Sequence, residues 1–175
     1  MKSYYNLVFF IFLIILPLKA FSNSNVKTIT FIDVDQIVYK SNIGSKEIGS
    51  INSRIDKQYE IFKNKELDLI AQKEEILSKK NILSKAELDK MINIYNKEFE
   101  KFNKEKNDFD NSINEERIVK INKLLQQLNS ILSSYAVENS IDLIIKKKDI
   151  IIGKSSLDIT DDIMKIFNNK VKQLN

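Results

Sequence analysis

The chain has 175 residues, a formal net charge of +4, and neither cysteine nor histidine. These two absences exclude disulfides, zinc sites of the His/Cys kind, and Ser-His or Cys-His nucleophiles. Of its 28 basic residues only Arg54 and Arg117 are arginine, the residue that contacts phosphate and guanine bidentately, so a nucleic-acid partner is disfavoured.

Residues 1–22 have the pattern of a cleaved secretory signal peptide. Lys2 precedes an unbroken apolar run from Leu7 to Leu16, and Ala20 and Ser22 supply small residues before the predicted cut. The alternative is a membrane anchor, but this run would span only about 15 Å as a helix, half of a ~30 Å hydrocarbon core. Cleavage predicts an exported mature chain from residue 23 onward.

The mature chain begins with a predicted strand and a short helix. Residues 28–34 (TITFIDV) are rich in β-branched and aromatic side chains and indicate a strand covered on both faces. Asp35 is predicted to cap a short helix that contains Ile37 and Val38 and ends near Gly44.

Residues 50–135 are predicted to form a helical-hairpin arm, since residues 50–152 contain no glycine or proline. The first helix is expected to begin after Gly49, and its apolar side chains recur every seven residues: Ile48, Ile55, Phe62, Leu69, Ile76 and Leu83. A strict seven-residue repeat predicts a supercoiled contact with a second helix. The other seam position is mostly polar (Gln58, Lys65, Gln72, Lys79), so the seam is narrow.

The hairpin tip is predicted at residues 80–84, because Ser84 and Glu87 form a capping box that starts the return helix. The return helix again repeats every seven residues through Leu88, Tyr95, Phe102 and Phe109. Residues 103–117 are very polar and are the predicted site of bending. Beyond them a firmer coiled-coil seam is expected at Ile118, Ile121, Leu125, Leu128, Leu132 and Tyr135.

Residues 23–49 and 136–175 are predicted to form a β-rich base. Strands are expected at residues 141–146 and 150–152, joined by a turn at 147–149, and Thr160 is expected to cap a last helix with Ile163, Phe167 and Val171 on its buried face. Three short strands leave exposed edges, so copies of the chain are expected to join their strands; cover by the terminal helix is the alternative. The predicted core of the base and its assembly is Ile29, Phe31, Ile32, Ile141, Leu143, Ile145 and Ile151.

Two segments at the ends of the mature chain are distinctive: residues 29–37 (ITFIDVDQI), and residues 141–168 (IDLIIKKKDIIIGKSSLDITDDIMKIFN) with the closing motif Leu157-Asp158-Ile159-Thr160. Both segments resemble the Skp/OmpH-like family of periplasmic chaperones. In the arms the resemblance is only compositional.

The resemblance implies an α+β fold in which three subunits pool their strands into a small barrel and project three coiled-coil arms around a cavity. It implies a periplasmic, ATP-independent holdase that binds unfolded outer-membrane proteins and delivers them for membrane insertion, without a cofactor or enzymatic activity. The sequence shows no Gly-rich phosphate loop. Contact with the insertion machinery and a weak lipid-surface contact stay open.

Candidate client-contacting residues on the arm are Phe99, which lies off the seven-residue series, and Lys79, Lys80 and Lys85 near the tip. Residues 86–117 carry six basic and nine acidic residues, so a strong electrostatic grip on acidic clients is not expected. The adjacent carboxylates, such as Glu74-Glu75, point about 100° apart on a helix and do not favour acid-base catalysis. The rival functions are a structural coiled-coil envelope protein or adaptor, and a basic lipid or nucleic-acid binder.

Overall fold

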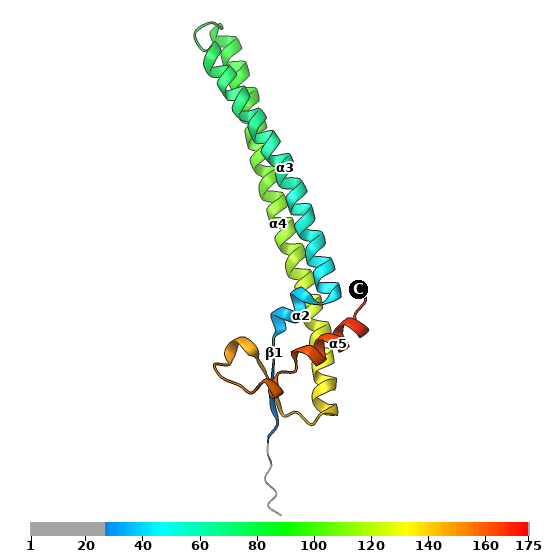
Figure 1. Cartoon of the computed structure of the whole chain (residues 1–175). Coiled ribbons are helices and arrows are strands. Elements are labelled where there is room, and N and C mark those ends of the chain that lie inside the picture. The colour runs from blue at the N-terminus through cyan, green and yellow to red at the C-terminus, as the bar shows by residue number, and fades with distance from the viewer. Residues whose placement is uncertain (1–26, 175) are drawn as a thin grey trace, which may run out of the picture.

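The computed structural model describes residues 27–174, so the predicted signal peptide lies outside the described residues. In chain order the elements are β1 (Ile29–Ile32), α2 (Val34–Lys40), α3 (Asn42–Lys79), α4 (Lys85–Glu138), β2 (Leu143–Lys146), the 3-10 turns η2 (Lys147–Asp149) and η3 (Ser155–Leu157), and α5 (Thr160–Lys170). Helices α3 and α4 lie side by side as a long arm, and the other elements gather around its lower end as a base (Figure 1).

The arm follows the predicted hairpin. Helix α3 ends at Lys79 and α4 begins at Lys85, so the segment between the two helices is residues 80–84. Both hydrogen bonds of the predicted capping box between Ser84 and Glu87 are present. The seven-residue series is confirmed as the buried face of α3, with Ile48, Phe62 and Leu69 buried.

The start of α3 differs from the prediction. The short helix α2 is capped by Asp33, whose side chain accepts from the backbone N–H of Gln36, and it ends at Lys40. Ser41 then caps α3, so the long helix begins at Asn42 and contains both Gly44 and Gly49. Gly44 is buried against the carbonyl oxygen of Val38, where a side chain would not fit, so this glycine serves close packing rather than a helix end.

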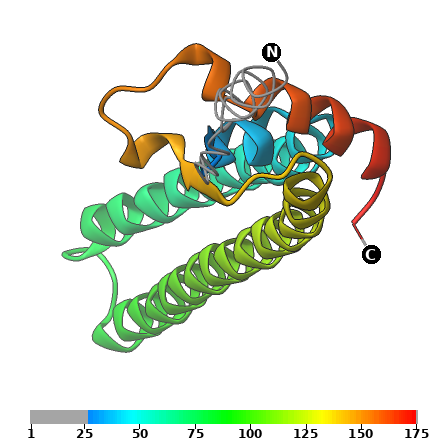
Figure 2. The same ribbon diagram turned by 90° about the horizontal axis from the view of Figure 1, so that it is seen from below.

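The base sheet has two strands in the described residues, β1 and β2, which pair in parallel with Ile29 opposite Leu143 and Ile32 opposite Lys146. The predicted strand at residues 150–152 is wrong for the single chain: the segment after β2 turns through η2 and loops away from the base (Figure 2). Its β-branched side chains favour a strand, but neither β1 nor β2, the strands of residues 27–174, pairs with it. Ile151 and Ile152 are 99% and 91% exposed.

The core of the base lies between β1, α2, the lower part of α4 and α5. It contains eleven buried side chains: Ile32, Ile37, Val38, Ile43, Leu124, Leu128, Ile131, Ile159, Ile163, Phe167 and Val171. This confirms the predicted buried face of the last helix. Thr160, however, is the first residue of α5 rather than its cap, and its backbone N–H donates to the Asp158 side chain.

Most of the predicted seam at the end of α4 is confirmed, because Leu128 is buried and Ile121, Leu125, Leu132 and Tyr135 pack against the core of the base. Leu124 and Ile131 are buried as well, whereas Ile118 is 59% exposed although it lies beside α3. The last part of α4 continues past the start of α3 and packs on α2 and α5, so its covered face there follows the base rather than one partner helix. Within residues 27–174, none of the helices combines the length and apolar character needed to cross a membrane.

Candidate functional site

The upper arm is held by a small aromatic core. Phe62, Leu69 and Phe102 are buried between α3 and α4, with Tyr95 and Phe109 packed against them. The ring of Phe62 meets those of Phe102 and Phe109 edge-on, at centroid distances of 6.0 and 5.7 Å. These contacts come from the predicted seven-residue series on both helices and fix the antiparallel register.

A ladder of polar contacts runs beside this core and uses the seam positions that the sequence left polar. Lys65 donates to Glu105 at 2.5 Å, and Gln72 donates to Glu98 at 2.7 Å. The hydrogen bond from Lys65 lowers the pKa of Glu105. These pairs were not predicted from the sequence, although the seven-residue spacing of Glu98 and Glu105 on α4 matches that of Lys65 and Gln72 on α3.

Polar contacts also join the two helices along the polar stretch at residues 103–117, on both sides of the seam. Arg54 pairs with Glu116 at 2.6 Å, and the Tyr59 hydroxyl donates to Asp110 at 3.0 Å, which raises the pKa of Tyr59. Helix α4 runs through this stretch without interruption. Because these ion pairs are exposed, each adds little stability, and bending at this stretch stays a prediction.

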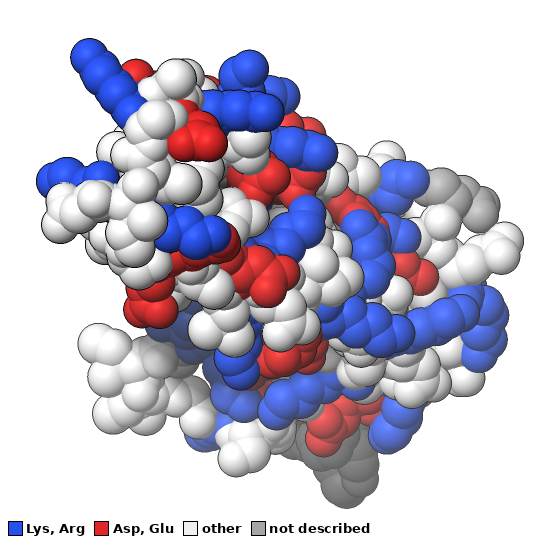
Figure 3. Space-filling view, turned by 90° about the horizontal axis from the view of Figure 1, so that it is seen from above, with Lys and Arg blue, Asp and Glu red and all other residues white. Residues whose placement is uncertain are grey.

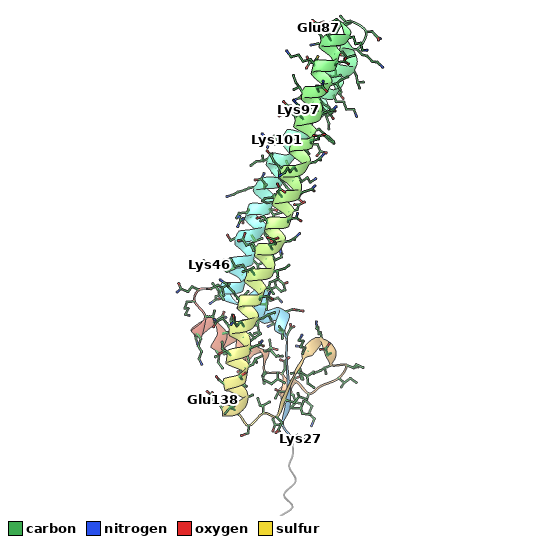
Figure 4. All side chains as sticks on the ribbon, turned by 180° about the vertical axis from the view of Figure 1, so that it is seen from behind. Lys27, Lys46, Glu87, Lys97, Lys101 and Glu138 are labelled. Atoms are coloured by element: carbon green, nitrogen blue, oxygen red, sulfur yellow. The ribbon has the colours of Figure 1, made fainter. Side chains whose placement is uncertain are left out.

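One flank of the upper arm is hollowed between the two helices. Two adjoining hollows of about 280 and 180 Å³ share Gln72 and Glu98. The charged residues that line them are Lys65, Asp68, Glu75, Glu98, Lys101 and Glu105. Lys101 lies in the upper half of α4, as the side-chain view shows (Figure 4). We call this side the groove flank.

The candidate client-contacting residues lie in different surroundings. Phe99 is 44% exposed and stacks on Tyr95, with ring centroids 5.9 Å apart. Lys80 and Lys85 are exposed, but Lys79 is half-buried and pairs with Glu75 at 2.5 Å. Seen from the tip, acidic and basic side chains are intermixed over the arm, without a large patch of one sign (Figure 3).

The predicted assembly residues divide into two groups in the single chain. Phe31 and Ile32 are buried, and Ile141 and Ile145 are half-buried. The others are exposed: Ile29 by 43%, Leu143 by 50% and Ile151 by 99%. A hollow of about 380 Å³ beside them is lined by Leu132, Ile144 and Ile145 among others. The base therefore presents apolar surface that the single chain does not cover.

The closing motif at residues 157–160 ties α5 to the start of the chain. Asp158 accepts hydrogen bonds from Lys147 at 2.8 Å and from the Thr160 backbone at 3.0 Å, and the Ile159 backbone donates to the Phe31 carbonyl. Burial acts to raise the pKa of Asp158, but the hydrogen bonds from Lys147 and Thr160 outweigh it and lower the pKa. In the described part of the chain, acidic side chains form no cluster of three suited to a metal ion.

Comparison with known proteins relates the sequence to one family and the fold to solved structures. The family model described as outer membrane protein (OmpH-like) matches residues 28–167. The fold is similar to a crystal structure assigned as an OmpH-like outer membrane chaperone from Caulobacter crescentus CB15, with a TM-score of 0.74 and 11% identity over 86% of this chain and 89% of that chain. No curated protein matches the chain.

Proposed function

Because the chain belongs to the OmpH-like family, we propose that it is a periplasmic chaperone that binds unfolded outer-membrane proteins without ATP and keeps them soluble for membrane insertion. Membership of the family supports a chaperone-type role. The ATP-independent binding of unfolded proteins, the identity of the clients and their delivery to the insertion machinery are our proposal. We propose no enzymatic step.

The observation that carries the proposal is the long arm with apolar side chains left on its surface. The buried core of the upper arm consists of a single seven-residue series from each helix. Other apolar side chains of the arm are more than two-fifths exposed: Leu67, Ile70, Leu77 and Phe99. Scattered apolar groups among lysines suit weak binding of many sequences. A structural spacer or adaptor, the rival function, has no use for these side chains and predicts assembly without protection of clients.

We propose that the base, residues 23–49 and 136–175, assembles three chains by pooling strands into a barrel. The uncovered apolar side chains of Ile29, Leu143 and Ile151 support assembly, because a monomer would leave them in water. In the trimer, the arms at residues 50–135 would surround a shared cavity.

The chaperone proposal is tested by diluting a urea-denatured outer-membrane β-barrel protein into buffer with the mature chain, without ATP. Light scattering should stay near baseline at one trimer per client. An unrelated coiled-coil protein of equal concentration is the control and should leave aggregation unchanged. Equal aggregation in the two samples would contradict the proposal.

The trimer is tested by native mass spectrometry of the same chain. Ile151→Asp should dissociate the assembly without altering the fold of each chain, since the Ile151 side chain is 99% exposed there. Ser156→Asp, an exposed residue in the same loop, introduces the same charge and should leave the mass unchanged. A monomeric parent chain, or dissociation by both variants, would argue against strand pooling through Ile151.

A further inference from the structure

One contact between α3 and α4 identifies the side of the arm opposite the groove flank. The ammonium group of Lys106 lies over the ring of Tyr59, 6.0 Å from its centroid. Residues seven apart in a two-helix seam keep the same face. This flank therefore carries two series: Tyr59, Glu66, Lys73 and Lys80 from α3 and its end, and Lys85, Ile92, Phe99 and Lys106 from α4.

Apolar side chains on this flank are exposed. Ile92 and Phe99 are 38% and 44% exposed. Ile70 and Leu77 lie three residues before and four residues after Lys73, so they adjoin its series on the surface of α3. They are 48% and 60% exposed. We call the surface formed by Ile70, Leu77, Ile92 and Phe99 the Phe99 flank.

The two flanks also differ in charge. The two series of the Phe99 flank carry four basic residues and one acidic residue: Lys73, Lys80, Lys85, Lys106 and Glu66. Asp110, which accepts the hydrogen bond from Tyr59, adds a second acidic residue to this side. The two hollows of the groove flank are lined by two basic and four acidic residues, and Lys79 beside them is a third basic residue on that flank. Lys79 lies seven residues after Gln72 and belongs to the groove flank, so three of the four predicted client-contacting residues share one surface and Lys79 does not.

Resting on the proposed chaperone function, we infer that the Phe99 flank is the surface that binds unfolded polypeptide, and that it favours segments combining apolar side chains with net negative charge. Its lysines complement that charge, whereas the acidic groove flank repels it. Apart from the half-exposed ring of Tyr59, each helix contributes only two exposed apolar side chains to the flank, spaced seven residues apart. A helix of a second copy would need such a stripe over three to four heptads, so an unfolded segment fits this surface better.

The lack of cysteine allows a direct test with single introduced cysteines. Asn96→Cys places a photo-crosslinker on the Phe99 flank, between Ile92 and Phe99, and Lys97→Cys places it one residue later, about 100° around α4. Both positions are exposed, and Lys97 lies on the upper arm one turn before Lys101 (Figure 4). The probes are two unfolded peptides with apolar residues at alternate positions, one with aspartate and one with lysine between them.

We expect Asn96→Cys to crosslink the aspartate peptide at least about fivefold more than Lys97→Cys does, and more than it crosslinks the lysine peptide. Equal crosslinking from both positions, or a preference for the lysine peptide, would overturn the inference. Crosslinks between chains at Asn96→Cys without peptide would also overturn it, by assigning the surface to another copy. If the parent chain fails to suppress client aggregation, the proposed function fails as well; if it protects while both cysteines crosslink equally, only the flank assignment fails.

A second pair of variants measures affinity instead of proximity. Ile92→Ser removes an apolar side chain from the Phe99 flank, and Ile94→Ser removes one of similar exposure from the groove flank. Ile92→Ser should raise the Kd for the aspartate peptide at least about threefold, while Ile94→Ser leaves it within error. Circular dichroism and Tm verify that both variants keep the fold. Equal weakening by the two serines would overturn the assignment of the flank.

Discussion

The backbone N–H of Asp33 donates a 2.9 Å hydrogen bond to the hydroxyl of Thr160, which lies 127 residues later in the chain. Thr160 is buried and its hydroxyl in turn donates to Asp158. This short chain of hydrogen bonds fixes the entry to α2 against the start of α5. The closing motif at residues 157–160 thus joins the two ends of the base through hydrogen bonds.

Replacing Thr160 should therefore loosen the base. Thr160→Val keeps the shape but leaves the Asp33 N–H unpaired, and we expect it to lower the free energy of unfolding by about 1–2 kcal/mol. Thr160→Ser keeps the hydroxyl and should cost less. Urea unfolding followed by circular dichroism measures both. A loss in Ser without a loss in Val would show that the methyl group, which only Val keeps, and not the hydrogen bond, stabilises this junction.

The Asp158 carboxyl should make stability depend on pH. Its pKa is lower in the folded chain than the usual value near 4, so its contribution is present above that value and is lost as pH falls through the folded pKa. We expect Asp158→Asn to cost about 1–2 kcal/mol at pH 7 and less near pH 3. Urea unfolding at the two pH values measures the difference. A cost independent of pH would contradict the assigned role of the ionised carboxyl.

Two glycines of α3 should respond oppositely to alanine. At Gly44 a Cβ would lie 1.9 Å from the Val38 carbonyl oxygen, so Gly44→Ala should destabilise the chain by at least about 3 kcal/mol. At Gly49 nothing lies within 4 Å of the added atom, and Gly49→Ala should stabilise α3 by up to about 1 kcal/mol. Thermal unfolding of the two variants checks this. A mild effect at Gly44 would mean that α2 can shift away from α3.

The aromatic core should decide whether the upper arm stays closed. Phe62 is 4% exposed, so Phe62→Ala should cost about 3 kcal/mol, the low end for a buried phenylalanine, and release the surrounding helices. Phe99→Ala removes a side chain that is 44% exposed and should cost less than about 1 kcal/mol. Hydrogen exchange of arm amides is the measurement, because local opening need not unfold the base. Similar exchange in both variants would mean that the ladder, not the core, closes the arm.

The sequence predicted the elements whose signals are local. The Ser84–Glu87 capping box located the tip, and the series through Phe62 and Leu69 located the buried face of α3, because both depend on residues within a few turns. Gly44 misled the prediction of the helix start, since its meaning comes from the Val38 carbonyl oxygen packed against it. Nothing near it in sequence signals that contact.

The remaining differences come from partners distant in sequence. Ile150 to Ile152 have the composition of a strand, but a strand also needs an edge, and composition does not say which chain supplies it. Ile118 continued an apolar pattern on α4, but it is exposed beside α3, to which its neighbours Arg117 and Lys120 bond. On the arm, Phe99 could be singled out from the sequence because it breaks the series, whereas its flank required the Lys106–Tyr59 contact.

The register of the arm makes its length adjustable. Each step of seven residues along α3 is matched by seven back along α4, as the pairs Lys65–Glu105 and Gln72–Glu98 show. Removing one heptad from each helix would shorten the arm by about 10 Å, keep every remaining pair in phase and leave the base untouched. Evolution can therefore rescale the reach of such a hairpin by paired insertions or deletions without redesigning the part that folds and assembles.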